Sequence, residues 1–170
     1  MEENQSKEQQ AAQLLQKINQ ESAKVEYRLL KAADLTEGYF NLLSQLTKAP
    51  YPEDKERIQA QFKFVNTNPD YFILLAVERE THNVLGTASL VIERKFIRDL
   101  ASTGHIEDVV VSKEARGLGV GKGLITALGA LAEGRGCYKI ILDCSEANQG
   151  FYEKCGYQKK GIQMGQYFNE

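Results

Sequence analysis

Apolar residues recur along this 170-residue chain with two periods, and the order of these periods predicts a mixed α/β domain. Runs rich in valine, isoleucine and leucine have the alternation or continuity of strands. Between them, apolar residues three or four positions apart indicate amphipathic helices. Helices in this order would cover the faces of a central sheet. The expected strands are 25–30, 71–78, 84–92, 103–111, 137–144 and 157–168 (one strand or a pair), and the expected helices are 35–46, 52–65, 118–133 and 148–155.

The first 24 residues are polar and rich in glutamine and glutamate, unlike the segment that begins at Val25. Ala11, Leu15 and Ile18 have helical spacing, so a short helix and a disordered lead are both open interpretations. The composition favours a polar extension over residues 1–24, followed by one globular domain over residues 25–170.

Composition and charge exclude several classes of function. The net charge is −2, so no basic surface for nucleic acid or acidic lipid is expected. No apolar run reaches the roughly 18 residues that span a bilayer. The three cysteines form no Cys-x-x-Cys pair and the two histidines are isolated, so no metal site is expected. An odd cysteine count without a signal peptide fits a cytoplasmic protein.

A glycine-rich loop, Arg116–Gly121, lies between an apolar strand and an amphipathic helix. The backbone N–H groups at such a helix start form a site for phosphate or pyrophosphate. A Walker A loop is excluded, because Gly123 stands where Ser or Thr is required. A Gly-x-Gly-x-x-Gly dinucleotide fingerprint also fails, because Lys122 and Leu124 occupy the positions of the third glycine.

The remaining pattern, Arg-x-x-Gly-x-Gly, resembles the coenzyme A pyrophosphate loop of the GCN5-related N-acetyltransferases (GNATs). That resemblance implies a GNAT fold, a mixed central sheet flanked by helices in which a splayed strand pair forms the acetyl-CoA cleft. Within this superfamily the chain is similar, from residue 25 to residue 164, to the eukaryotic glucosamine 6-phosphate N-acetyltransferases. The segments that carry this similarity are Ile92–Lys95, Gly104–Val111, Arg116–Lys122, Gly136–Cys144 and Asn148–Tyr157.

The resemblance implies the residues that bind acetyl-CoA. The N–H groups of Leu118–Gly121 would hold the pyrophosphate, although glycines alone would fit a simple tight turn. The backbone edge of Val109–Val111 would bind the pantetheine arm and polarise the thioester carbonyl, or the strand is merely buried. Asn148 would hold a cofactor amide or cap its helix. The cofactor-binding candidates are Val109, Val110, Val111, Arg116, Gly117, Leu118, Gly119, Val120, Gly121, Asn148 and Tyr152.

Three carboxylates and one phenol are the candidate catalytic groups: Tyr152, Asp143, Glu107 and Asp108. Neighbours in a strand point to opposite faces, so Glu107 and Asp108 are not expected to form a dyad. They fit a structural ion pair, or else one binds sugar hydroxyls while the other orients or deprotonates the amine. Resemblance places Asp143 near the sugar amine. Tyr152 would protonate the leaving thiolate, unless it packs in the core, for which Phe151 is the better candidate.

A basic segment near residue 95 is a solvated loop or a site for the sugar phosphate, which suits guanidinium and ammonium donors. Lys139 shares its strand parity with Asp143 and would face the same side. The substrate-binding candidates from the resemblance are Thr47, Arg94, Lys95, Phe96, Ile97, Glu107, Asp108, Tyr138, Lys139 and Asp143.

One departure concerns the end of the chain. The family has a basic residue there that reaches the phosphate from a partner subunit, whereas this chain has Tyr167 at that position. Lys95 and Lys139 are the candidates to replace that charge. A homodimer that shares or exchanges C-terminal strands is implied by the resemblance alone.

The sequence thus predicts an enzyme that moves acetyl from acetyl-CoA to the 2-amino group of glucosamine 6-phosphate by direct attack, in UDP-N-acetylglucosamine biosynthesis. Two alternatives stay open. One is a GNAT that acetylates a protein or a polyamine, and the other is a non-catalytic regulator that binds acyl-CoA.

Overall fold

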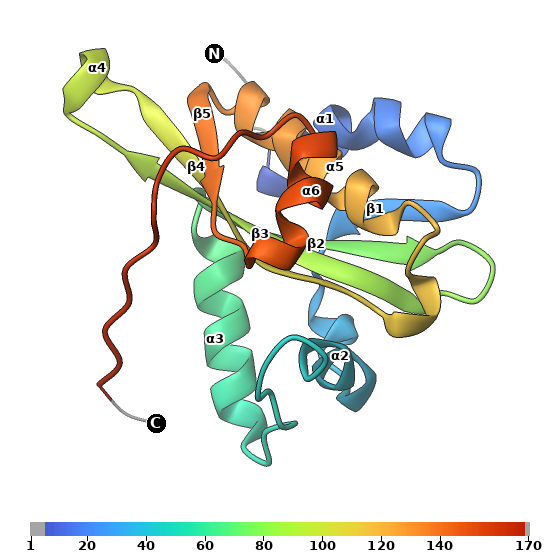
Figure 1. Cartoon of the computed structure of the whole chain (residues 1–170). Helices are drawn as coiled ribbons and strands as arrows, with labels where there is room; N and C mark the ends of the chain where they lie inside the picture. Colours follow the sequence, from blue (N-terminus) through green and yellow to red (C-terminus); the bar gives the residue numbers. More distant parts are fainter. Residues whose placement is uncertain (1–5, 169–170) are drawn as a thin grey trace.

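A computed structural model describes residues 6–168 and contains one five-stranded sheet in the order β1-β2-β3-β4-β5 (Figure 1). The first four strands pair antiparallel with their neighbours, and β4 pairs parallel with β5. The strands are β1 Val25–Leu29, β2 Tyr71–Glu78, β3 Val84–Arg94, β4 Ser102–Val111 and β5 Cys137–Leu142. The helices are α1 Lys7–Glu21, α2 Glu37–Leu43, α3 Lys55–Thr67, α4 Ile97–Leu100, α5 Val120–Gly134 and α6 Glu146–Lys154, with 3-10 turns η1 Ala32–Asp34 and η2 Lys113–Ala115.

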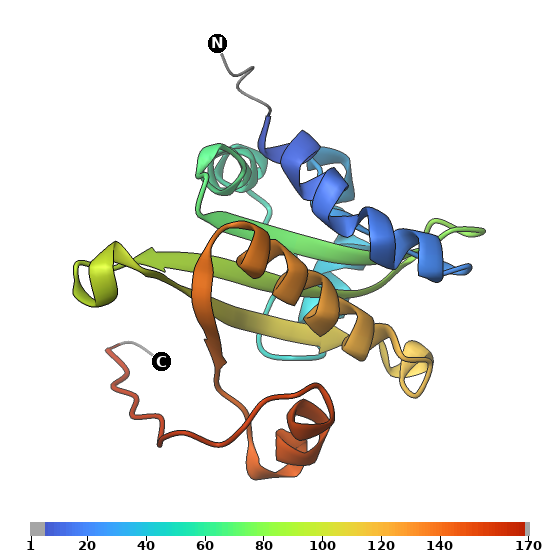
Figure 2. The same ribbon diagram turned by 90° about the horizontal axis from the view of Figure 1, so that it is seen from above.

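Helices cover both faces of the sheet, which confirms the predicted α/β architecture. In β2, Leu74 and Ala76 pack with α1 and α5, while Leu75 and Val77 pack with α2 on the opposite face. This alternation is the strand period of two. Figure 1 shows α1 and α5 above the sheet and α2 and α3 below it. Figure 2 shows the β3–β4 hairpin projecting outward, with α4 at its tip.

The N-terminal segment differs from the polar extension that composition favoured. Ser6 accepts a hydrogen bond from the backbone N–H of Gln9 and so starts α1. Ala11 is 2% exposed and Leu15 is 1% exposed, and both belong to the main core. The helical spacing of these residues was therefore the informative signal, and Lys7–Glu21 is part of the folded unit.

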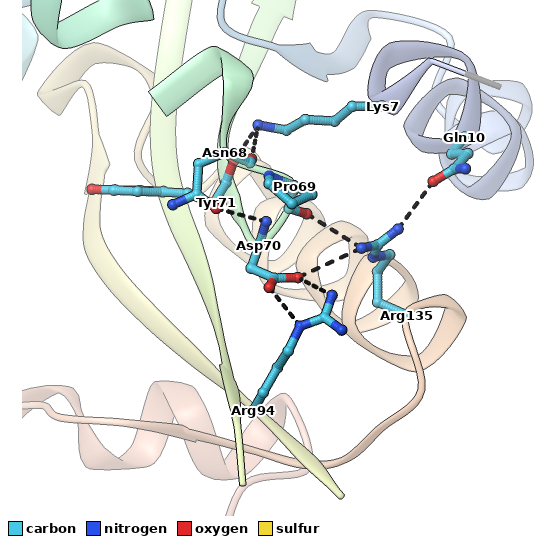
Figure 3. Close-up of polar contacts among 8 residues, drawn as sticks. All are labelled: Lys7, Gln10, Asn68, Pro69, Asp70, Tyr71, Arg94 and Arg135. Carbon is cyan, nitrogen blue, oxygen red and sulfur yellow. Dashed lines mark hydrogen bonds and ion pairs between the residues drawn. The ribbon is translucent and has the colours of Figure 1, made fainter. Parts of the chain in front are cut away.

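A polar network fastens α1 to the rest of the molecule (Figure 3). The Lys7 ammonium caps the end of α3 by donating to the carbonyl oxygens of Val65 at 3.0 Å and Asn68 at 2.9 Å. Burial, together with the nearby charge of Arg135, lowers the pKa of Lys7 to about 8. Arg135, which follows α5, also donates to Gln10 at 3.0 Å. The network therefore joins α1, α3 and α5.

The position of α5 on the sheet depends on a glycine. A Cβ at Gly123 would lie 1.8 Å from the hydroxyl oxygen of Tyr27, so only glycine lets the helix approach β1 this closely. The packed side of α5 includes Leu124 and Leu128, both 0% exposed. This close packing fixes the position of α5 on the sheet and therefore the position of its first turn.

Several boundaries differ from the predicted ones: α2 and β5 are shorter, and α3 begins three residues later. Helix α5 begins two residues later than expected and α6 begins two residues earlier. Residues 157–168 form no strand, so the predicted final strand is wrong for this single chain. A strand needs a neighbour for its backbone groups, and Ile162 and Met164 in this segment are 87% and 90% exposed. We call residues 157–168 the C-terminal tail.

We predict that Leu15→Ala lowers the free energy of unfolding by about 2–5 kcal/mol, because it leaves a cavity in a packed core. Gln16→Ala, at the exposed neighbouring position, should change it by less than about 0.5 kcal/mol. Denaturant unfolding followed by circular dichroism measures both. Equal effects of the two variants would contradict the inclusion of α1 in the core.

Candidate active site

The site begins where β4 and β5 separate. Their parallel pairing extends from Ser102 opposite Cys137 to Ile106 opposite Leu142 and ends there. Beyond this point β4 still pairs with β3, where Val110 lies opposite Thr87. In the described part of the chain, no strand pairs with the other edge of Val109–Val111. The predicted splayed strand pair is therefore present, and it leaves backbone N–H and C=O groups for a ligand.

A β-bulge in β4 lies at the mouth of this opening. The register with β3 shifts between Thr87 and Ser89, and Asp108 has φ 52°, in the left-handed region. The extra residue interrupts the alternation on which the expected opposite directions of Glu107 and Asp108 depend. Glu107 pairs opposite Ser89, and the charge of Asp108 contributes to the raised pKa of Tyr39, which packs in the α2-covered core cluster.

Three carboxylates lie together at the separation of the strands. Partial burial, then the charge of Asp143 and then that of Asp108, raise the pKa of Glu107. Burial above all, with a contribution from Asp108, raises the pKa of Tyr39 to about 12 and also raises the pKa of Tyr71. The two tyrosines were not predicted as site neighbours, because no local sequence pattern marks the bulge at Asp108.

Asp143 lies just outside β5, which ends at Leu142. Its predicted shared parity with Lys139 therefore does not apply, because residue 143 is not in the strand. The Asp143 carboxylate accepts a hydrogen bond of 2.6 Å from the side-chain amide of Gln163 in the C-terminal tail. No local sequence pattern marks Gln163, since twenty residues separate it from Asp143.

Tyr152 is the buried aromatic of α6, at 9% exposure, whereas Phe151 is 37% exposed. The expectation that Phe151 is the better core residue is therefore wrong. The Tyr152 ring contacts Phe151 with centroids 4.9 Å apart and Tyr157 with centroids 6.1 Å apart. Burial, more than the neighbouring cysteines, raises the pKa of Tyr152, so the phenol keeps its proton at neutral pH. Tyr152 and Asp143 line one cavity of about 390 Å³.

The glycine loop forms the other end of the opening. Gly117 has φ 80° and Gly119 has φ 79°, and a Cβ at either position would meet nothing within 4 Å. The glycines are thus required by backbone conformation and not by crowding. Gly119 provides no side-chain cap for α5, so the first N–H groups of this helix are available to an anion. Arg116, Leu118 and Gly119 are exposed beside them.

Asn148 occupies the third position of α6, and Ser145 is the N-cap residue. The alternative that Asn148 caps the helix is therefore wrong. Its side chain is exposed on the helix that carries Tyr152, and its candidate role toward the cofactor stays a prediction.

The basic segment does not lie beside Glu107 within one chain. Arg94 pairs with Asp70 at 2.7 Å, and Lys95 pairs with Glu93 at 2.6 Å. Arg94 is also opposite Ser102 in the hairpin, and the five residue steps from Ser102 to Glu107 span roughly 17 Å. Phe96 and Ile97 lie at the hairpin tip, 95% and 64% exposed.

Two further cations and one further candidate lie on other elements. The Lys139 ammonium is 5.4 Å from the centroid of the Tyr138 ring, and the Arg98 guanidinium is 5.1 Å from the same ring. Thr47 is exposed in the turn after α2. This turn is tied to η2 because Gln45 accepts a 3.0 Å hydrogen bond from the N–H of Lys113.

A five-stranded mixed sheet with a splayed parallel pair and an uncapped, glycine-rich helix start is the arrangement of an acetyltransferase of the GNAT class. The family model described as "Acetyltransferase (GNAT) family" matches residues 36–157, and the chain belongs to this family. Members use acetyl-CoA as co-substrate, and both the free N–H groups of α5 and the open edge of β4 fit it.

Within this family the relatives are glucosamine 6-phosphate N-acetyltransferases. The chain is 42% identical over 144 residues to glucosamine 6-phosphate N-acetyltransferase 1 of Dictyostelium discoideum, covering 84% of this chain and 90% of that one. It is 41% identical to the glucosamine 6-phosphate N-acetyltransferase of Arabidopsis thaliana, covering 84% and 95%. The crystal structure of the Arabidopsis thaliana glucosamine-6-phosphate N-acetyltransferase is 38% identical, with TM-score 0.80, and covers 85% of this chain and 99% of that one.

Metal-binding groups and membrane-spanning helices were sought among the described residues. Residues 6–168 contain no group of three or more His, Cys, Asp or Glu arranged to hold a metal ion. No helix in that range has the length and apolar character to cross a membrane.

We predict that Gly119→Ala weakens acetyl-CoA binding by roughly five- to thirtyfold. The methyl group fits, but a left-handed alanine costs about 1–2 kcal/mol and shifts the N–H groups of the loop. Gly129→Ala is the matched control, because position 129 is helical with open space. It should stabilise the fold by about 0.5–1 kcal/mol without changing affinity. Calorimetric titration with coenzyme A measures the affinity of both variants and of the wild type. An affinity of Gly119→Ala equal to that of the wild type would refute this role of the loop.

Proposed function

We propose that this protein transfers acetyl from acetyl-CoA to the 2-amino group of D-glucosamine 6-phosphate, giving N-acetyl-D-glucosamine 6-phosphate and coenzyme A, as a step of UDP-N-acetylglucosamine biosynthesis. The observation that carries the proposal is the cluster of Glu107, Asp108 and Asp143 beside the open edge of β4. Such a cluster suits an amine acceptor, and the similar proteins are named for this acceptor.

The proposed binding of acetyl-CoA follows the two exposed backbone features. The N–H groups of Leu118–Gly121 hold the pyrophosphate, with Arg116 adding charge, and the edge of Val109–Val111 binds the pantetheine arm. An N–H group of this edge also stabilises the oxyanion that forms when the amine attacks the thioester carbonyl. Asn148 contacts a cofactor amide.

The proposed proton transfers use the carboxylates and Tyr152. The substrate ammonium must lose a proton before attack, and Glu107 or Asp108 accepts it while Asp143 orients the amine. Collapse of the intermediate expels the coenzyme A thiolate, which takes the phenolic proton of Tyr152. The surplus proton that the nitrogen carries after attack passes to the tyrosinate and restores the phenol. No acyl-enzyme forms, so the reaction needs no nucleophilic side chain. The acceptor contacts proposed from the resemblance also include Thr47, Arg94, Lys95, Phe96, Ile97, Tyr138 and Lys139.

The proposal includes a homodimer in the cytoplasm. The free edge of β5, the C-terminal tail and the hairpin tip support a dimer, because apolar side chains are exposed on them. Phe96 at the tip is 95% exposed, and Tyr167 and Phe168 in the tail are each 83% exposed. A second subunit would give the tail a strand neighbour and bring Arg94–Ile97 of one chain toward the site of the other. The three cysteines without disulfides suit the cytoplasm.

The acceptor assay measures thiol release from acetyl-CoA with three amines. Glucosamine 6-phosphate should react with a higher kcat/KM than glucosamine, and spermidine should not react. Equal activity on both sugars would contradict a phosphate site. Activity on spermidine alone would favour the polyamine alternative, and coenzyme A binding without turnover would favour a regulator.

We predict that Tyr152→Phe lowers kcat by roughly 100-fold and leaves the KM for acetyl-CoA nearly unchanged, because it removes the proton donor but keeps the ring. Steady-state kinetics with glucosamine 6-phosphate measures both constants. Tyr157→Phe removes a hydroxyl from the ring that packs against Tyr152 and serves as the control. An undiminished kcat in Tyr152→Phe would rule out the acid role.

We predict that Glu107→Gln abolishes most turnover without destabilising the protein near neutral pH. The pKa of Glu107 is raised above 4.5 in the fold. The stability contributed by this group is therefore present below the unfolded pKa and lost as pH rises through the folded pKa. The glutamine variant should thus be as stable as the wild type or more stable at pH 7, and the gain should shrink near pH 4.

Thermal unfolding at the two pH values measures the stability difference. Glu80→Gln, in the exposed β2–β3 turn, is the control and should behave as the wild type. A lower unfolding temperature of Glu107→Gln than of the wild type at pH 7 would contradict the prediction, because its loss of turnover would then follow from unfolding.

A further inference from the structure

Two buried hydroxyl side chains of β3 lie beside the bulge in β4. Thr87 is 1% exposed and Ser89 is 3% exposed. Ala88 between them packs in the core cluster of α1 and α5, so both hydroxyls lie on the opposite face of the sheet, under α2. The register with β4 shifts between the two residues. Buried hydroxyls need hydrogen-bond partners, and a tyrosine provides one for each.

The first pair, Tyr39 and Thr87, uses both of its protons inside the core. The Tyr39 phenol, from α2, forms a hydrogen bond with Thr87. Thr87 donates its own proton to the backbone carbonyl oxygen of Leu74 at 2.9 Å. Because a hydroxyl has one proton to donate, Tyr39 must be the donor to Thr87. The role of this pair is therefore structural.

The second pair, Tyr71 and Ser89, uses only one of its two protons. The Tyr71 phenol, from β2, forms a hydrogen bond with Ser89. Figure 3 shows the Tyr71 ring directed away from the Lys7 network that binds its backbone. In the part of the chain that the structure describes, no backbone carbonyl accepts the second proton of the pair. That proton is available to another acceptor.

Glu107 is placed to accept this proton. It lies directly opposite Ser89, and such residues have Cβ atoms roughly 5 Å apart on one face of the sheet. Burial first, and then the charges of Asp108 and Glu107, raise the pKa of Tyr71. The phenol therefore keeps its proton, and both carboxylates lie near it.

The other charged groups around Glu107 do not supply a donor. Burial, Asp143 and Asp108 raise the pKa of Glu107, and His105 lowers it. The two aspartates are acceptors when ionised. The His105 ring is bonded to Glu93 at 2.9 Å.

We propose that Ser89, held by Tyr71, donates a hydrogen bond to the Glu107 carboxylate and so positions Glu107 as the base for the substrate ammonium. This inference rests on the proposed function and selects Glu107 over Asp108. The ammonium N–H bond breaks and the Glu107 carboxylate gains the proton. Ser89 and Tyr71 are positioning residues and keep their own protons.

The test measures the pH profile of kcat/KM for glucosamine 6-phosphate. Ser89→Ala removes the donor, which destabilises the charged carboxylate, so the acidic limb should move upward by roughly half a pH unit or more. Tyr71→Phe should move the limb in the same direction and by less. The double variant should move it no further than Ser89→Ala alone, since Tyr71 acts through Ser89. The KM for acetyl-CoA should not change.

Tyr39→Phe is the matched control, because it removes the phenol of the pair whose protons stay in the core. It should lower the unfolding temperature and leave the acidic limb at the pH of the wild type. The substrate groups titrate alike in every variant, so a difference between limbs reports on the enzyme.

Carbon-13 NMR of the Glu107 carboxyl group, identified by its loss in Glu107→Gln, tests the hydrogen bond without substrate. Titration at a higher pH in Ser89→Ala than in the wild type supports the inference, and an unmoved titration overturns it. A moved titration with an unmoved acidic limb would overturn the choice of Glu107 as base. A wild type that does not acetylate glucosamine 6-phosphate would instead reject the proposed function, and the NMR titration would still decide the hydrogen bond.

Discussion

The separation of β4 from β5 after Ile106 is the constraint on which the rest of the site depends. A parallel pair that continued would use the backbone groups of Val109–Val111 for the sheet and leave none for a ligand. The bulge at Asp108 lies immediately before this free edge. The close packing of α5 against Tyr27 fixes the helix on the sheet, and the helix start lies beside Val111 at the end of this free edge. One local break in pairing therefore creates both the cofactor edge and the position of the carboxylates.

This arrangement concentrates negative charge at an unfavourable place. Glu107 lies near Asp143 and Asp108, and its raised pKa reflects burial and their repulsion. A sheet selected only for stability would gain little from three carboxylates at one strand end. An ammonium acceptor would relieve their repulsion, so the charge cluster has a physical explanation in the proposed reaction.

Much of the fold could be predicted from the sequence because the strands are short and their patterns are clear. The strand Tyr71–Glu78 begins and ends where its apolar run does. The glycine loop was also readable, because positive φ at Gly117 and Gly119 requires this residue type. The bulge was not readable, because Asp108 adopts positive φ without being glycine. The strand predicted for the C-terminal tail is absent from the single chain. Ile162 and Met164 form a strand-like pattern, but their segment has no neighbouring strand within one chain. The sequence did not predict helix α1 as part of the domain, because the segment is polar apart from two buried positions, Ala11 and Leu15.

Amide hydrogen exchange with and without coenzyme A tests the central claim most directly, because it reports on the backbone groups themselves. The account predicts slowed exchange at Val109–Val111 and at Leu118–Gly121 when coenzyme A is added. The exchange rates of amides in β1, the strand at the opposite edge of the sheet, should change only as much as the global stabilisation by the ligand requires. Binding of coenzyme A without protection at either segment would contradict the account, because the cofactor would then lie elsewhere than between the splayed strands and the start of α5.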